Sequence, residues 1–286
     1  MIARLLFLAT LATTPVFAAE PPLNLRVMSF NIRYINPGDT GNRTWQARRD
    51  QVADVMRADN PDLVGLQEAF RSMLDDIAAR LPGYQEIGVG REDGNGTGEY
   101  AALLVRKERF KVLDSGTFWL SDTPDVPNSR SWKNQVTRIC TWARLEDRSS
   151  GRPLFFYNTH FDHESQEARE KGARLILEHI AKRPPGTPIV LTGDFNAAED
   201  NPAITVLEQW PPALVDAWRT LHPDVPLSES GTMSNFTGAT DSGKIDYIFV
   251  PAGTLVDDAK ILRSHQNGVY PSDHYPVRAS IGFPAQ

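Results

Sequence analysis

Apolar residues along the chain fall in short runs separated by polar and glycine- or proline-containing turns, a pattern typical of many strands with a few helices between them. Helical spacing covers residues 44–58, 72–81 and 164–182, with a further helical turn at 203–207. Strands are predicted at residues 25–30, 62–66, 101–105, 138–145, 154–158, 189–194, 245–250, 255–262 and 277–281. Strands outnumber helices, and helical crossovers interrupt them. This order predicts an α/β (α+β) four-layer sandwich, in which two packed, mainly antiparallel β-sheets are flanked by helices.

Three segments carry weaker patterns. Residues 94–98 are glycine-rich, but no Lys-Ser/Thr pair and no helix follow, so we interpret them as a mobile loop rather than a nucleotide-binding loop. Residues 121–135 are expected to form a long surface loop over the functional site. Residues 208–241 show too little periodicity to predict an element.

The chain has 286 residues, 41% of them hydrophobic and 23% charged, which is enough to bury a sizeable core. Residues 1–18 resemble a secretory signal peptide, with Arg4 before a short apolar run and a small-residue cleavage site at Ala18. No later segment reaches membrane length, so no stable membrane anchor is expected. We predict a single domain over residues 19–286, a secreted or periplasmic location and a monomer.

The net charge of −6 argues against a broad surface that tracks nucleic-acid phosphates. An acidic enzyme that acts on phosphoesters would need a cation to offset repulsion between its carboxylates and the substrate. Cys140 is the only cysteine, which excludes an intramolecular disulfide and suggests a small buried apolar residue.

The most informative stretch is the predicted strand 189–194, which runs into Gly193-Asp194-Phe195-Asn196. Strand alternation would point Asp194 and Asn196 to one face and Phe195 to the other. A carboxylate and a carboxamide at the end of a buried strand form a polar site on a rigid support. The carboxylate can orient a water molecule or bind a metal, and the amide can donate to an anionic oxygen.

Other strands also end in groups that are capable of chemistry, and loops at strand ends are where scaffolds position catalytic residues. These groups are Asn31, Glu68, His160, Asp246 and the pair Asp273-His274. Carboxylates with an amide suit a hard cation, Mg²⁺ or Mn²⁺, better than zinc, because thiolates and closely paired histidines are missing. An imidazole beside an aspartate could accept a proton or stabilise charge on phosphorus.

Six motifs in order resemble those of the endonuclease/exonuclease/phosphatase superfamily, which includes pancreatic-type deoxyribonuclease, abasic-site endonucleases, sphingomyelinases and inositol-polyphosphate 5-phosphatases. They are Ser29-Phe30-Asn31-Ile32-Arg33, Leu66-Gln67-Glu68, Asn158-Thr159-His160-Phe161-Asp162-His163, Gly193-Asp194-Phe195-Asn196, Lys244-Ile245-Asp246-Tyr247-Ile248 and Ser272-Asp273-His274-Tyr275-Pro276-Val277. The segments Gly98-Glu99-Tyr100 and 118–124 further resemble an exported bacterial branch whose substrates are poorly defined.

The resemblance implies a role for each matching residue. Glu68 would be the principal metal ligand, helped by Asn31 and Asp273. Asp194 would position or deprotonate the attacking water, and Asn196 would hold a phosphate oxygen. His160 would also hold the phosphate or protonate the leaving group. Asp246 would orient His274, which stabilises the transition state, and either this pair or Asp194 would be the base.

The resemblance also suggests residues around the substrate. Glu99 matches an acidic partner of His160, and Arg138 falls where a phosphate-contacting arginine is expected, with a surface salt bridge as the alternative. Tyr100 could face either the core or the site. His163 either extends the site or begins a helix.

The favoured function is therefore that of an exported, divalent-metal-dependent phosphoesterase that uses activated water on a phosphodiester or phosphomonoester. A secreted nuclease acting on DNA or RNA is an alternative within this class. A glycoside hydrolase with paired carboxylates is an alternative of another class, although it leaves Asn196, His160 and His274 without roles. A catalytically silent binding module is the third.

Overall fold

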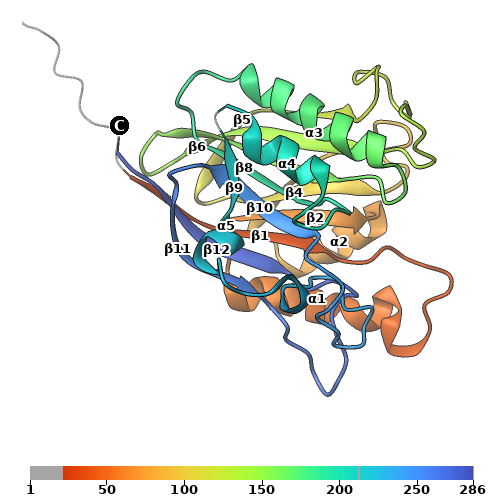
Figure 1. Cartoon of the computed structure of the whole chain (residues 1–286). Coiled ribbons are helices and arrows are strands. Elements are labelled where there is room, and N and C mark those ends of the chain that lie inside the picture. Colours follow the sequence, from red (N-terminus) through yellow and green to blue (C-terminus); the bar gives the residue numbers. More distant parts are fainter. Residues whose placement is uncertain (1–21, 212, 286) are drawn as a thin grey trace, which may run out of the picture.

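Two six-stranded sheets form the centre of the molecule (Figure 1). The computed structural model describes residues 22–211 and 213–285, so the predicted signal peptide lies outside the described residues. The first sheet has the order β11-β12-β1-β2-β4-β3. Its strands are β1 (Leu23–Asn31), β2 (Leu63–Ala69), β3 (Tyr84–Ile87), β4 (Tyr100–Arg106), β11 (Leu255–Ile261) and β12 (Val277–Phe283).

The second sheet has the order β5-β6-β7-β8-β10-β9. Its strands are β5 (Phe110–Trp119), β6 (Ile139–Asp147), β7 (Pro153–His160), β8 (Ile189–Asp194), β9 (Leu214–Asp216) and β10 (Asp246–Pro251). In each sheet one central pair is parallel, β1 with β2 and β7 with β8, and the other pairs are antiparallel. The predicted pair of mainly antiparallel sheets is confirmed.

Helices cover the outer faces of both sheets (Figure 1). α1 (Trp45–Asp59) and α2 (Arg71–Arg80) pack on the first sheet, while α3 (Gln166–Ala181) and α4 (Pro202–Gln209) pack on the second. Because side chains alternate along a strand, Val27 faces the core between the sheets and its neighbour Met28 faces α1 and α2. The predicted four layers follow from this alternation.

Two segments add to or differ from the sequence analysis: 208–241 contains elements that were not predicted, and 121–135 is a surface loop as predicted but lies elsewhere than expected. The segment 208–241 contains β9 and the short helix α5 (Ala217–Leu221), which Asp216 caps by accepting hydrogen bonds from the backbone of Trp218 and Arg219. The segment 121–135 does not line the functional cleft. It packs against the start of α3, where Ser165 Oγ donates to the carbonyl of Trp132.

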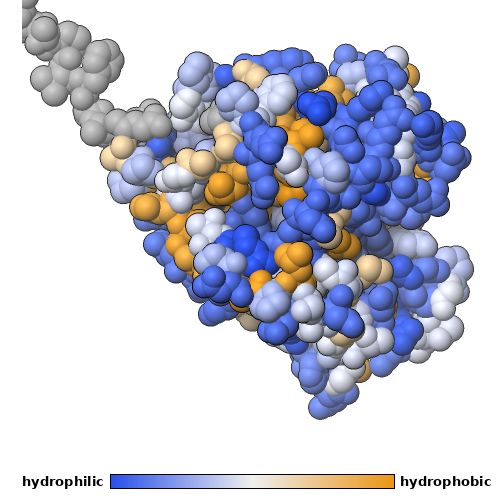
Figure 2. Space-filling view, viewed as in Figure 1, coloured by the Kyte–Doolittle hydropathy of each residue, from blue (hydrophilic) through white to orange (hydrophobic). Residues whose placement is uncertain are grey.

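No helix in the described part of the chain is both long and apolar enough to cross a bilayer. On the face shown in Figure 2, hydrophilic side chains dominate and apolar ones form small groups.

A buried polar network joins the two sheets beneath the functional site. The Asn158 amide on β7 donates to the carbonyls of Leu66 and Ala102 on the first sheet, and its oxygen accepts from Gln67 Nε2 at 2.6 Å and Thr192 Oγ1 at 3.0 Å. All four of these bonds are made between buried groups, and such a network rigidifies a core, although Gln67 Oε1 has no partner among the described residues. The network therefore fixes β2 against β7 and β8.

Gly65 makes room for this network. A Cβ atom at this position would lie 2.1 Å from Thr192 Oγ1 and 2.5 Å from Asn158 Oδ1. We expect Gly65→Ala to lower the free energy of unfolding by about 1–3 kcal/mol from overpacking, and by more if Asn158 loses partners. Urea denaturation measures the loss. The control is Gly83→Ala, whose new Cβ meets no atom within 4 Å and which should change stability by less than about 0.5 kcal/mol. Equal stability of the two variants would contradict this prediction.

Candidate active site

Strand direction gathers the predicted site residues at one edge of the sandwich. The parallel pairs place the ends of β1, β2, β7 and β8 together. β4, β6, β10 and β12 run antiparallel to these strands, so the residues at their starts lie at the same edge. In the ladder, Asp194 at the end of β8 is paired with His160 on one side and Asp246 on the other.

The result is a single cleft of about 420 Å³. It is lined by Arg33, Tyr34, Glu68, Arg91, Glu99, Val136, Arg138, His160, His163, Asp194, Asn196, Met233, Asp273 and His274. Asn31 and Asp246 lie directly behind this lining, bonded to Glu68 and His274.

Glu68 reaches the cleft through an irregularity in β2. The pairing register between β2 and β4 shifts between Leu66 and Ala69, and Glu68 has a φ of 63°. A bulge re-aims a side chain, and left-handed backbone at a glutamate is uncommon and costs free energy. Two bonds hold the carboxylate, one from Asn31 Nδ2 at 3.0 Å and one from the backbone N–H of Tyr34 at 2.9 Å.

Asp194 and Asn196 both face the cleft, as expected, but strand alternation is not the reason. β8 ends at Asp194, and Asn196 adopts a left-handed φ of 45°. The backbone N–H of Asn196 donates to Asp194 Oδ1 at 2.9 Å, which closes a tight turn. Phe195 is buried against Phe161 and Tyr247, so its predicted anchoring role is confirmed.

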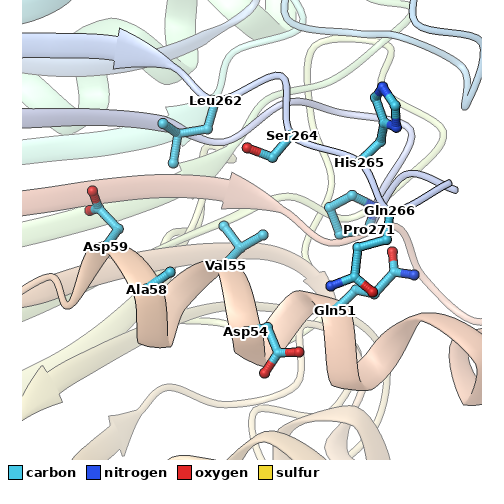
Figure 3. A pocket seen from close by; sticks show the side chains of 10 residues that line it. All are labelled: Gln51, Asp54, Val55, Ala58, Asp59, Leu262, Ser264, His265, Gln266 and Pro271. Carbon is cyan, nitrogen blue, oxygen red and sulfur yellow. The ribbon is translucent and has the colours of Figure 1, made fainter. Parts of the chain in front are cut away.

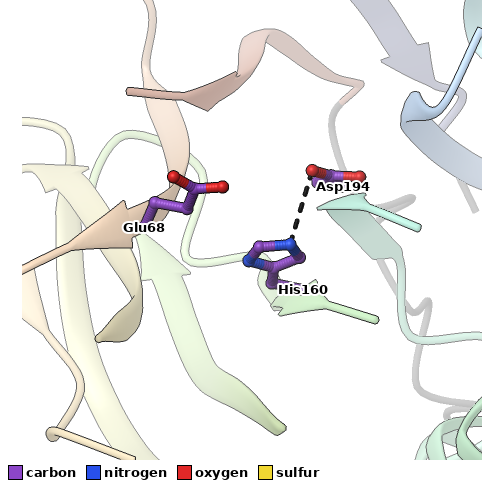
Figure 4. A group of neighbouring side chains, drawn as sticks. All are labelled: Glu68, His160 and Asp194. Carbon is purple, nitrogen blue, oxygen red and sulfur yellow. Dashed lines mark ion pairs between the residues drawn. The ribbon is translucent and has the colours of Figure 1, made fainter. Parts of the chain in front are cut away.

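His160 lies between the carboxylates of Glu68 and Asp194 (Figure 4). One ligand-type atom from each of the three residues lies within 4.8 Å of the others. His160 Nε2 is 3.5 Å from Asp194 Oδ2, and Asn196 Nδ2 donates to the same nitrogen at 3.0 Å.

His274 and Asp246 form a buried pair on the other side of Asp194. His274 Nδ1 is 2.9 Å from Asp246 Oδ2, and Nε2 points toward Asp194 Oδ2 at 3.9 Å. A loop that the sequence did not single out supports the pair, because Thr232 Oγ1 accepts from the backbone N–H of Asp246 and the carbonyl of Thr232 accepts from Tyr275.

Two of the three histidines that line the cleft, His160 and His274, differ in charge. Burial alone would lower the pKa of His274, but Asp246, Asp194 and Asp273 raise it well above its ordinary value. Burial, with Arg138 and Arg91, lowers the pKa of His160 well below its ordinary value. At neutral pH His274 is therefore an imidazolium and His160 is a neutral imidazole. Burial, and then the Asp246 charge, also raise the pKa of Asp194.

Of the residues predicted to surround the substrate, Arg138, Glu99 and His163 line the cleft and Tyr100 does not. Arg138 is buried in the cleft wall, where it donates to His163 Nδ1 at 3.0 Å, so it is no surface salt bridge. Glu99 lines the cleft, but its oxygen is 3.9 Å from His160 Nδ1, beyond hydrogen-bond length. Tyr100 packs in the core under α2 and lies outside the cleft lining.

Two arginines of the cleft were missed as site residues. Arg33 Nη1 is 3.3 Å from Asp273 Oδ2, and Arg91 forms a bidentate pair with Glu99 at 2.8 and 2.9 Å. Arg33 stands inside the motif Ser29-Phe30-Asn31-Ile32-Arg33, so its position could have been noticed from the sequence. Arg91 follows a glycine in a loop and carries no local signal.

The oxygen-rich side of the cleft fits a hard divalent cation. Burial raises the pKa of Asp273, the neighbouring charge of Glu68 raises it further, and both carboxylates line the same cleft. Like charges held together in this way are relieved by a cation, and carboxylate oxygens are the ligands that Mg²⁺ and Mn²⁺ prefer. Asn31 contacts the group through its amide nitrogen, which donates to Glu68 and Asp194.

A second cavity of about 370 Å³ lies between α1 and the loop that precedes β12 (Figure 3). Val55, Leu262 and Pro271 give it an apolar wall. Its two aspartates are engaged elsewhere, Asp54 with Arg57 and Asp59 with Arg278. None of the residues that line this cavity belongs to a group of carboxylates and imidazoles like those of the cleft.

Comparison with known proteins decides the family. The model of the Endonuclease/Exonuclease/phosphatase family matches residues 28–274. The chain belongs to this family. The matched range contains every predicted site residue, and membership indicates a hydrolase that acts on phosphoesters.

Solved structures of the family are closely similar. An endonuclease/exonuclease/phosphatase from Bacteroides vulgatus is 36% identical with a TM-score of 0.83, over 91% of this chain and 98% of that one. A mannosyl-6-phosphatase from Bacteroides thetaiotaomicron is 33% identical with a TM-score of 0.82, over 91% of this chain and 100% of that one.

A more distant relative was found by sequence. Tyrosyl-DNA phosphodiesterase 2 from Danio rerio is 24% identical over 69% of this chain, and the match spans 47% of that protein's length.

Proposed function

We propose that the protein is an exported, divalent-metal-dependent phosphoesterase that cleaves a phosphomonoester of a small polar molecule, such as a sugar phosphate. The observation that carries the proposal is the convergence of Glu68, Asp194, Asn196, His160 and His274 on one cleft. A cleft of about 420 Å³ suits a small ligand. The 33% identity to a mannosyl-6-phosphatase supports a sugar phosphate, and the net charge of −6 disfavours nucleic acid.

Each cleft residue has a part in this reaction. Asp194 accepts a proton from the attacking water, and its raised pKa brings it closer to the working pH of a general base. Asn196 Nδ2 donates to His160 Nε2 and to the carbonyl of Phe161, so Asn196 positions the His160 ring in the cleft. His274 is cationic and buried, so it stabilises charge that develops on the phosphoryl group. Asp246 holds His274 in place through Nδ1.

Glu68 and Asp273 would hold the cation, with Asn31 orienting the Glu68 carboxylate. When bound, the metal supplies Lewis-acid polarisation of a phosphate oxygen. His160 and Arg138 face the same space, where Arg138 contributes hydrogen-bond donors to the substrate.

A substrate panel tests the function. Purified protein is assayed with Mg²⁺ or Mn²⁺ against mannose 6-phosphate, glucose 6-phosphate, p-nitrophenyl phosphate, bis-p-nitrophenyl phosphate and a DNA oligonucleotide. We expect the highest kcat/KM for a sugar phosphate. Preference for DNA or for the diester would favour the nuclease alternative, and failure to hydrolyse any of these phosphoesters would contradict the proposal.

Metal removal gives a separate prediction. Excess EDTA should abolish turnover, and Mg²⁺ or Mn²⁺ should restore it. Glu68→Gln should raise the metal concentration for half-maximal activity by more than roughly 100-fold, because it removes a charged ligand rather than a supporting group. Titration of the metal against initial rate measures the shift. Full activity in EDTA would contradict metal dependence.

A further inference from the structure

Arg91 and Glu99 form an ion pair in the cleft wall next to His160. Both oxygens of Glu99 are occupied, by Arg91 Nη1 at 2.8 Å and Nη2 at 2.9 Å. Both side chains are about 13% exposed, and both line the cleft together with Asn196 and Arg138. The pair thus belongs to the surface that a substrate would touch.

His160 has an unsatisfied atom directed at this pair. The Asn196 amide nitrogen donates to the carbonyl of Phe161 at 3.0 Å, which fixes the orientation of the amide, and its second hydrogen faces His160 Nε2. Nε2 is therefore an acceptor, and the proton of the neutral ring lies on Nδ1. Nδ1 is buried and has no hydrogen-bond partner among the described residues, with Glu99 Oε2 3.9 Å away.

A buried donor without an acceptor costs free energy, roughly 1–3 kcal/mol. Glu99 is the nearby acceptor, and Arg91 engages both of its oxygens. A small void, lined by Arg91, Glu99, His160 and Arg138 among others, separates these side chains, so the carboxylate has room to approach the ring.

The backbone of Arg91 is anchored while its side chain has one partner. Its N–H donates to the carbonyl of Glu99, and its own carbonyl accepts from Trp119 Nε1 at 2.7 Å. Within the described part of the chain, Glu99 is the only side-chain partner of the guanidinium. Arg91 can therefore change partners without any movement of the loop.

We propose that Arg91 is a substrate-recognition residue that transfers from Glu99 to an anionic oxygen of the bound phosphoester, and that the released Glu99 then accepts a hydrogen bond from His160 Nδ1. The exchange rests on the proposed phosphoesterase function. It satisfies the buried Nδ1 donor only when substrate is present, and it fixes the His160 ring at the moment of reaction. Arg91 thereby links substrate binding to the position of an imidazole that contacts Asn196 and faces Asp194.

Arg91→Met tests the exchange, with Arg174→Met as the matched control, since Arg174 lies exposed on α3 and loses the same charge. Inorganic phosphate is the probe, measured as a dissociation constant by calorimetric titration and by ¹H–¹⁵N spectra of histidine-labelled protein, in which His160→Gln assigns the signal. Phosphate should move the His160 Nδ1–H proton of the wild type downfield. Arg91→Met should show the downfield signal without phosphate, and its dissociation constant for phosphate should rise about tenfold to a hundredfold.

Further variants separate the outcomes. Glu99→Ala should abolish the downfield signal in every state, and Arg91→Lys, which cannot form the bidentate pair, should fall between wild type and Arg91→Met. Binding within twofold of the control, or a His160 signal in the wild type that does not respond to phosphate, would overturn the inference. Failure of the wild type to hydrolyse any phosphoester would overturn the proposed function instead, because neither phosphate binding nor the spectrum requires turnover.

Discussion

Asp194→Asn should lower kcat by about 10²–10⁴-fold, the contribution typical of a positioned general base. The amide keeps the volume of the side chain and can still accept a hydrogen bond from Asn31, but it cannot take a proton from water. KM should change much less than kcat, because proton transfer belongs to the transition state rather than to substrate binding. Steady-state kinetics on the best substrate of the panel measure both constants.

The matched control is Asp147→Asn. Asp147 is also a buried carboxylate, but it is the last residue of β6, whereas Arg138 directly precedes the first. It therefore lies at the end of the strand away from the cleft, where it pairs with Arg109. This variant should lose stability and retain kcat within about twofold. If Asp194→Asn also retained kcat, Asp194 would not be the general base.

The sequence predicted the framework of the site because two simple rules determine it. Apolar periodicity located β8, and strand direction brings the ends of β1, β2, β7 and β8 to one edge. Polar residues at those ends then had to meet. The convergence of Glu68, Asp194, Asp273 and His274 was thus foreseeable without knowledge of loop conformation.

The orientation of individual side chains could not be predicted in the same way. Glu68 enters the cleft through a bulge with left-handed backbone, and no propensity predicts that conformation for a glutamate. Asn196 reaches the expected face through a turn rather than through strand alternation. The position of Arg91 depends on a loop anchored by Trp119, a contact between segments 28 residues apart.

The same limit explains the missed elements near residue 216. β9 has three residues and α5 has five, which is too short for the alternation of apolar and polar residues to show a strand or helix period. Their stability comes from tertiary contacts, with Ala217 and Trp218 buried between the sheets. Residues 230–234, which support Asp246 and His274, have no periodic pattern at all.

His274→Ala should lower kcat by about 10²–10³-fold, as the loss of one preorganised donor to a developing charge does. His274 is cationic because Asp246, Asp194 and Asp273 outweigh the effect of burial. Its Nε2 faces Asp194, so the positive charge of the ring lies beside the carboxylate that accepts the proton from water. The substitution leaves an uncharged cavity, so it removes the stabilisation by the imidazolium and leaves Glu68 unchanged.

Asp246 should act only through that imidazole, and a double-mutant cycle tests this dependence. Asp246 Oδ2 bonds His274 Nδ1 at 2.9 Å, while Oδ1 has no hydrogen-bond partner among the described residues. Asp246→Asn alone should reduce kcat by about tenfold or more, because it misorients the ring and lowers its pKa. In the His274→Ala background the same change should cost nothing further, since members of one catalytic unit are not additive. Additive losses in kcat would show that Asp246 has a separate role, and urea denaturation of the four proteins would distinguish that role from a loss of stability.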